Sequence, residues 1–160
     1  MNTSTQFQIT PLAKTLFTNL FSLTDTELNE RGIRRMVADA KPCYPCRISL
    51  ADAEIGERIL LLPHLHQDVY SPYRASGPIF VREAATEAAL AVDEVPESIK
   101  TRLMSFRAYD DQDMMTESAV IEGKEAASQI KRMLADDRVA YLHLHFAGAG
   151  CYSCKVNRVS

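Results

Sequence analysis

The sequence predicts an α+β fold, in which helices flank a mainly antiparallel sheet of about six to eight strands. Segments that alternate between apolar and polar residues outnumber the segments with helical periodicity. Several alternating segments are joined by short polar or glycine-containing turns, which are typical of hairpins. Their order also lacks the regular exchange of strand and helix that builds a parallel sheet.

Length and composition set the class of protein. With 160 residues, of which 46% are hydrophobic, we expect one globular domain over residues 1–160. The net charge of −3 is spread without a long block of one sign, so no nucleic-acid partner is expected. No apolar segment approaches the roughly 20 residues of a membrane span, and the N-terminus lacks the pattern of a secretory signal. We therefore expect a cytoplasmic protein with no membrane partner.

The first elements expected are helices. Thr10 and Pro11 suit the N-cap and first position of a helix, and apolar residues follow at helical spacing as far as Phe21. Thr24 and Glu27 form a capping-box pattern that begins a second, short helix. The next segments expected are strands at 33–38, 59–66 and 79–83, a loop at 71–78 and a helix at 85–92.

The second half of the chain reads mainly as strands. Pro96 suits the start of a short helix, and the polar DDQD turn joins strands at 103–110 and 116–123. Residues 123–137 place apolar side chains on one face of an amphipathic helix. The last strands expected are 139–146 and 152–159.

The four cysteines occur as two CxxC pairs, Cys43 with Cys46 and Cys151 with Cys154. Two sulfurs at this spacing can bind one metal ion, and paired cysteines of a reducing compartment favour metal or redox chemistry over disulfides. The long gap between the pairs is not that of a compact zinc ribbon. A zinc site of four cysteines, a disulfide between the pairs and unbonded buried thiols all stay open.

The four histidines also occur as pairs, in PHLH and LHLH. Alternate residues of a strand share one face, so His143 and His145 should project together, as should His64 and His66. If the two strands are neighbours, their imidazoles can converge on a metal; otherwise they are polar residues on a solvated face. Cys151 follows His145 after a short turn, so these two residues are also candidates for a catalytic nucleophile and base.

A turn-rich loop carries candidate substrate-binding residues. Tyr73, Arg74 and Arg82 lie between two expected strands, where a rigid sheet can position them. Arginine binds carboxylate or phosphate through two parallel hydrogen bonds, which points to a small anionic ligand. The alternative is a solvated loop in which an arginine pairs with Glu83.

Three runs of the sequence resemble the bacterial domain of unknown function 1203 family: ADAKPCYPCRISLADAEIGERILLL, DVYSPYRASGPIFVRE and YLHLHFAGAGCYSCKVNR. The resemblance spans most of the chain and implies no activity. The family pattern has cysteine at two of the four cysteine positions and favours histidine near three of the four histidines. It therefore implies a mixed metal site, with zinc as the expected metal, formed by Cys46, His66, His143, His145 and Cys151.

The sequence leaves three classes of function. The first is a metal or thiol site beside the loop that carries Arg74. The second is a metal-free enzyme acting on a small anionic substrate. The third is an interaction module that forms a homodimer through a sheet edge or the N-terminal helix.

Overall fold

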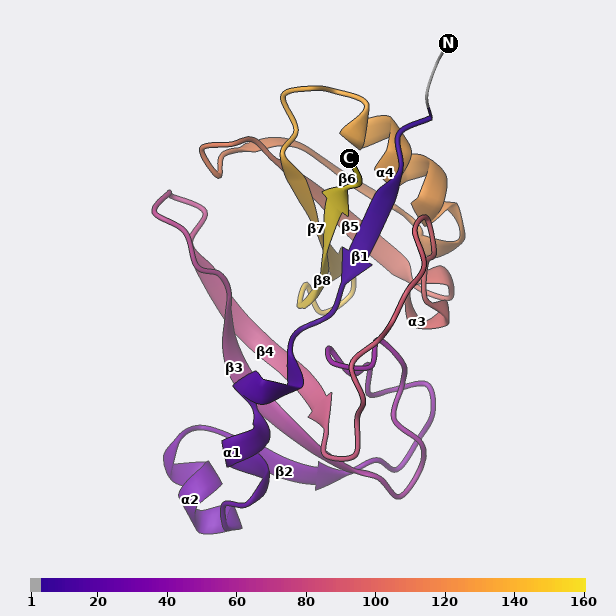
Figure 1. The fold of residues 1–160 in the computed structure, drawn as a ribbon. Helices are drawn as coiled ribbons and strands as arrows, with labels where there is room; N and C mark the ends of the chain where they lie inside the picture. The colour runs from indigo at the N-terminus through magenta and orange to yellow at the C-terminus, as the bar shows by residue number, and fades with distance from the viewer. Residues whose placement is uncertain (1–3) are drawn as a thin grey trace.

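A computed structural model describes residues 4–160 and contains two antiparallel sheets, one above the other in Figure 1. The five-stranded sheet has the order β1 (Phe7–Thr10), β8 (Tyr152–Arg158), β7 (Tyr141–Phe146), β5 (Leu103–Tyr109) and β6 (Met115–Glu122). The three-stranded sheet has the order β2 (Arg34–Val37), β3 (Arg58–Gln67) and β4 (Ala75–Arg82). The helices are α1 (Thr18–Phe21), α2 (Asp25–Glu30), α3 (Glu97–Lys100) and α4 (Ala126–Leu134), with the 3-10 turns η1 (Lys14–Leu16) and η2 (Gly123–Glu125). The predicted α+β class with mainly antiparallel pairing is confirmed.

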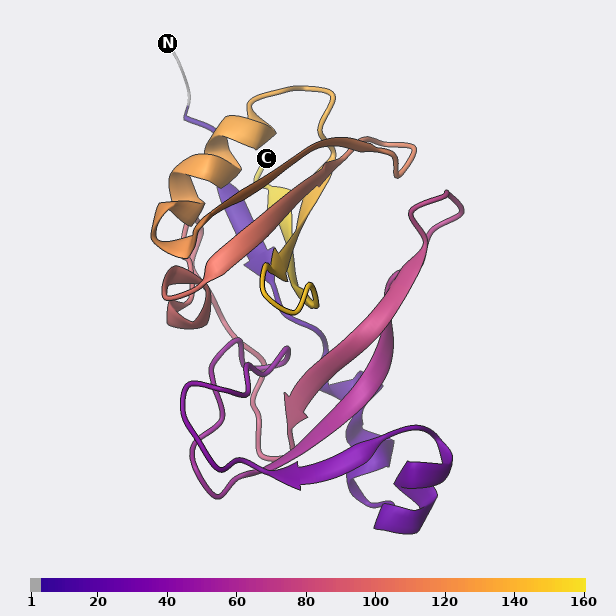
Figure 2. The same cartoon turned by 180° about the vertical axis from the view of Figure 1, so that it is seen from behind.

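Helix α4 covers one face of the five-stranded sheet (Figure 2). Its apolar side, with Ile130 and Met133, packs on Leu142 and Leu144 of β7 in a shared core. This is the amphipathic helix that the sequence predicts. His143 and His145 lie on the opposite face of β7, away from α4.

The smaller sheet has its own core under α1 and α2. Thr24 caps α2: its hydroxyl accepts from the Glu27 amide at 3.2 Å, and the Glu27 carboxylate accepts from the Thr24 amide at 2.7 Å. The predicted capping box is therefore confirmed. It directs Leu28 onto Leu60, Leu62 and other buried residues of the sheet.

One expected helix is right only in its second half, and another is absent. The chain around Thr10 is the end of β1, and the helical turns begin only at Lys14. Phe7 and Ile9 are buried on one face and pair with β8, so this long-range pairing outweighs the local helix signal. Residues 85–92 contain no helix; the Ala88 amide donates to the carbonyl of Ile48 at 2.9 Å, a bond that joins this segment to a distant part of the chain.

The β3–β4 hairpin links the two sheets. Strand β4 begins at Ala75, so the predicted loop at 71–78 is shorter than expected. The far half of the hairpin rises beside the larger sheet in Figure 1. There His66 of β3 stacks on Tyr152 of β8, with ring centroids 5.3 Å apart. A strand of the smaller sheet thereby reaches the histidine face of β7.

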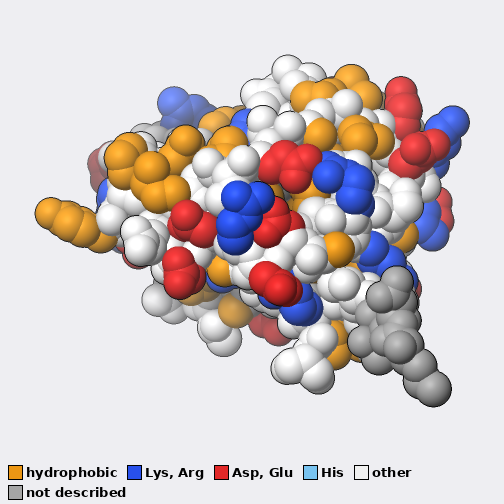
Figure 3. Space-filling model, turned by 90° about the horizontal axis from the view of Figure 1, so that it is seen from above, with side chains coloured by type: hydrophobic (Ala, Val, Ile, Leu, Met, Phe, Trp, Pro, Cys, Tyr) orange, Lys and Arg blue, Asp and Glu red, His pale blue; other side chains and the backbone are white. Residues whose placement is uncertain are grey.

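The surface seen in Figure 3 carries acidic and basic side chains interspersed, and apolar side chains at the protruding tip of the β3–β4 hairpin. Tyr70, in this tip, is fully exposed. Among residues 4–160, none of the helices has the length and hydrophobicity of a membrane-spanning segment.

Candidate functional site

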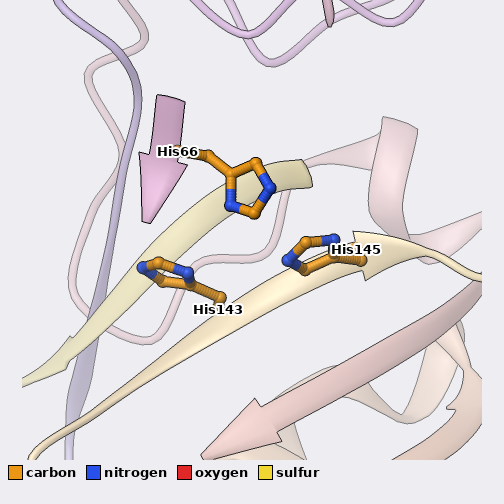
Figure 4. A group of neighbouring side chains, drawn as sticks. All are labelled: His66, His143 and His145. Atoms are coloured by element: carbon orange, nitrogen blue, oxygen red, sulfur yellow. The ribbon is translucent and has the colours of Figure 1, made fainter. Parts of the chain in front are cut away.

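Three histidines converge between β3 and β7 (Figure 4). His66, His143 and His145 each offer one ring nitrogen, and these nitrogens lie within 4.8 Å of one another. His143 and His145 are 3% and 1% exposed, whereas His66 is half-buried. Imidazole nitrogens in this arrangement are ligands that zinc and related metals prefer.

The strand register places each histidine. His143 and His145 alternate with Leu142 and Leu144, which lie in the core, so both imidazoles project from the other face as the sequence predicts. His143 is paired with Arg107 on β5 and with Lys155 on β8. The site therefore has a cation on each side of its central histidine.

Two β-bulges aim further side chains at the site. In β8 the pairing passes from Cys154 opposite Leu144 to Tyr152 opposite His145, so β8 holds one extra residue, Ser153. A second irregularity lies in β3 between His64 and Gln67, where one extra residue again faces β4. A bulge turns the strand and re-aims its side chains. The bulge in β8 brings Tyr152 onto the histidine face, within 5.7 Å of the His145 ring centroid.

Each of the three histidines keeps one ring nitrogen that has no hydrogen-bond partner among the described residues. Nδ1 of His145 lies 2.9 Å from the carbonyl oxygen of Gly150. A carbonyl can only accept, so Nδ1 carries the proton and Nε2 keeps its lone pair. His145 Nε2, His66 Nδ1 and His143 Nδ1 are buried and have no hydrogen-bond partner among the described residues. Each such orphaned atom costs about 1–3 kcal/mol, which a bound metal would recover.

Burial keeps the imidazoles neutral. It lowers the pKa of His143 to about 3 and those of His66 and His145 to about 4, with neighbouring positive charges acting in the same direction. A histidine must be neutral to bind a metal, and at pH 7 all three are.

A polar chain holds β3 against the sheet. Gln67 donates from its side-chain amide to the hydroxyl of Tyr141 at 3.0 Å, and that hydroxyl donates to the Asp113 carboxylate at 2.6 Å. The Tyr141 ring stacks on Tyr109, whose ring centroid is 5.4 Å from that of His143. These contacts fix the position of the neighbouring His66.

The cysteines lie outside this histidine group. Cys151 packs against the core of the larger sheet, and its sulfur accepts from Nη2 of Arg47 at 3.1 Å. The buried Cys46 sulfur accepts from the backbone amides of Arg82 at 3.3 Å and Ile48 at 3.4 Å. No hydrogen bond joins His145 to Cys151, since the His145 Nδ1 contacts Gly150 and the Cys151 sulfur contacts Arg47. Of the five ligands expected, the structure brings together the three histidines.

All four cysteines are free thiols. Cys43 is exposed and Cys151 half-buried, and both line a cavity of about 240 Å³ together with Arg47. His64, the fourth histidine, contacts Phe17 and Tyr152 at ring-centroid distances of 5.9 and 6.5 Å and is not a member of the histidine group.

The expected anion-binding residues lie apart. Arg74 is exposed and pairs with Asp68, whereas Arg82 donates to Glu57 at 2.8 Å and not to Glu83. The two arginines flank β4 or end it, which separates them by roughly 25 Å at about 3.3 Å per residue. Tyr73 instead packs on Tyr109, with ring centroids 5.9 Å apart.

Sequence reasoning missed Arg107, Lys155 and Tyr152 as members of this face. Arg107 was detectable, because it alternates with the buried residues Phe106 and Ala108. Lys155 was detectable in the same way, because it alternates with the buried residues Cys154 and Val156. Tyr152 depends on the bulge in β8, which alternation cannot reveal.

Comparisons with known proteins give one result. No curated protein and no solved structure matches the chain. One family model, Protein of unknown function (DUF1203), matches residues 43–158, which include both cysteine pairs and all four histidines. The chain therefore belongs to the family Protein of unknown function (DUF1203).

Proposed function

We propose that this protein binds one divalent transition metal, with zinc as the best fit, through His66, His143 and His145. The observation that carries the proposal is the convergence of three neutral imidazoles, each of which has one buried ring nitrogen without a hydrogen-bond partner among the described residues. The carbonyl of Gly150 adds support, because metal-binding histidines generally donate their other ring nitrogen to such a group.

The three histidine nitrogens can bind zinc if the rings move slightly closer together. Tetrahedral zinc with nitrogen ligands at about 2.0–2.1 Å separates those nitrogens by about 3.4 Å. The present separations reach 4.8 Å, so the rings must approach by at most about 1.4 Å in the widest pair. His66 can supply this movement, since it is half-buried and lies on the hairpin.

Three protein ligands leave one position for water or substrate, as in catalytic zinc sites. A metal held in this way supplies an acidic water or polarises a bound oxygen. His66 is the least buried of the three histidines, so we place the open position on its side of the group. We therefore favour a metal-dependent enzyme of the reducing cytoplasm, where the four cysteines stay free.

The test is metal content in the full chain, purified without tag or chelator, followed by zinc titration of the metal-free protein. Wild type should hold about one equivalent, and His143→Ala should lose at least tenfold in affinity. His64→Ala is the matched control, because His64 lies on the same hairpin strand outside the group. Equal affinities in the two variants would exclude the three-histidine site.

A second candidate function is thiol chemistry at Cys151. A guanidinium at 3.1 Å from the sulfur and an adjoining cavity are the surroundings expected of a nucleophilic thiolate. Limiting iodoacetamide followed by peptide mapping tests it. Cys151 should be labelled before Cys43 although Cys43 is more exposed; labelling in the order of exposure would remove this candidate.

A further inference from the structure

Two cations on the histidine face have no acidic partner. Arg107 and Lys155 stand on either side of His143, and neither forms a salt bridge within the described residues. Nε of Arg107 donates only a long bond, 3.4 Å, to the Ser105 hydroxyl. Nζ of Lys155 lies 4.5 Å from the centroid of the Tyr141 ring. Both side chains are half-buried, where an unbalanced charge costs more than at the surface.

Other half-buried arginines of this protein are paired. Arg82 binds Glu57, and Arg102 binds Asp52 through two nitrogens. Asp113, which contacts Tyr141 beside His143, already accepts from the Tyr141 hydroxyl at 2.6 Å. Arg107 and Lys155 differ from these arginines in having no carboxylate partner among the described residues.

Their charge reaches the histidines. Arg107 and Lys155 are the cross-strand partners of His143 on β5 and β8, so both charges lie on the same face as the imidazole. A divalent metal would add further positive charge at the same place. A site with this excess favours an anionic ligand.

We propose that the site takes a small molecule with an oxyanion group, phosphate or carboxylate, which Arg107 and Lys155 hold beside the metal position. This inference rests on the proposed metal site and names its substrate class. The two residues are two strand spacings apart, about 9.5 Å between backbones, and both side chains are long enough to reach an oxyanion above His143. Arginine supplies a planar pair of donors and lysine a point charge.

The experiment titrates inorganic phosphate and, separately, acetate into the zinc-loaded full chain by calorimetry. We expect Arg107→Gln and Lys155→Gln each to weaken binding of the preferred anion by about tenfold or more. Arg74→Gln, which removes an exposed arginine paired with Asp68, is the matched control and should leave binding unchanged. The tighter of the two anions identifies the group that the site prefers.

Measuring zinc affinity distinguishes a failure of the anion site from a failure of the three-histidine metal site. Loss of either cation removes a repulsion, so both glutamine variants should bind zinc as tightly as wild type or more tightly. Zinc binding without measurable binding of either anion at millimolar concentration would overturn the anion proposal alone, as would equal weakening in the Arg74 control. If zinc does not bind, the titrations are repeated on the metal-free protein. Phosphate or acetate binding that depends on Arg107 and Lys155 there supports the anion site, and its absence overturns it.

Discussion

Nδ1 of His145 lies 2.9 Å from the carbonyl oxygen of Gly150, across the turn that joins β7 to β8. Gly150 has φ +80°, a backbone conformation that glycine adopts at little cost. The turn therefore orients an imidazole whose other nitrogen faces His66 and His143. Backbone geometry at position 150 is thus coupled to the ligand geometry of the metal site.

The first prediction uses this coupling. Gly150→Ala strains the turn at positive φ and displaces the carbonyl, so zinc affinity should fall about tenfold while the fold is retained. Gly148→Ala is the matched control in the same turn, since a Cβ there would meet no atom within 4 Å and its φ is ordinary. Competition titration with a chromophoric chelator measures both. Equal zinc affinities would show that the Gly150 carbonyl does not orient His145.

The second prediction concerns pH. Because folding lowers the pKa of these histidines from about 6.5 to about 3 or 4, the unfolded chain binds more protons below pH 6.5. The free energy of unfolding of the metal-free protein should therefore fall as the pH drops from about 6.5 to 4. Urea denaturation at several pH values measures this slope. His143→Gln should flatten it, and an unchanged slope would mean that His143 is not held neutral by burial.

Much of the fold was predictable because it depends on local patterns. Alternation located the face on which His143 and His145 lie, and the capping box located α2. The errors arose where distant pairing decides the outcome. Phe7 and Ile9 form an edge strand on β8, which outweighs the helix signal that follows them.

The site was predictable only in part for the same reason. Sequence spacing identified that His143 and His145 share a face, but it identified neither which strands meet nor the irregularity between His64 and Gln67. Tyr152 reaches the histidine face through a bulge at Ser153 that no residue pattern indicates. Cys46 and Cys151 were grouped with the histidines by family resemblance, whereas their sulfurs accept hydrogen bonds from the backbone of Arg82 and the side chain of Arg47.

The third prediction separates a three-histidine site from a mixed one. If the histidines alone hold zinc, Cys46→Ser and Cys151→Ser should keep the metal stoichiometry of wild type. Zinc should also leave the reaction of Cys43 and Cys151 with a thiol reagent unchanged, since neither cysteine belongs to the histidine group. Thiol counting with and without zinc, and on denatured protein as reference, measures this. Protection of Cys151 from the reagent by zinc would show that Cys151 is a ligand together with the histidines.

The fourth prediction concerns Arg47, which is 1% exposed and links the segment around Pro45 to the β7–β8 turn at Cys151. Its guanidinium donates to the carbonyl of Tyr152 at 2.7 Å, to the carbonyl of Pro45 and to the sulfur of Cys151. Arg47→Met keeps much of the volume but leaves these buried acceptors unpaired, at about 1–3 kcal/mol for each carbonyl. We expect the free energy of unfolding to fall by about 3 kcal/mol or more.

The same variant should also weaken zinc binding, because Arg47 anchors the backbone of Tyr152, on whose ring His66 stacks. Arg138→Met is the control: Arg138 is exposed and pairs with Asp136, so its loss should change stability by less than about 0.5 kcal/mol. Urea denaturation and zinc titration of both variants give the two readouts. If Arg47→Met is as stable as wild type and binds zinc with full affinity, the Arg47 contacts with Cys151 and Tyr152 do not position the histidine group. A loss of both stability and zinc affinity would show that Arg47 stabilises the fold and also positions the histidine group.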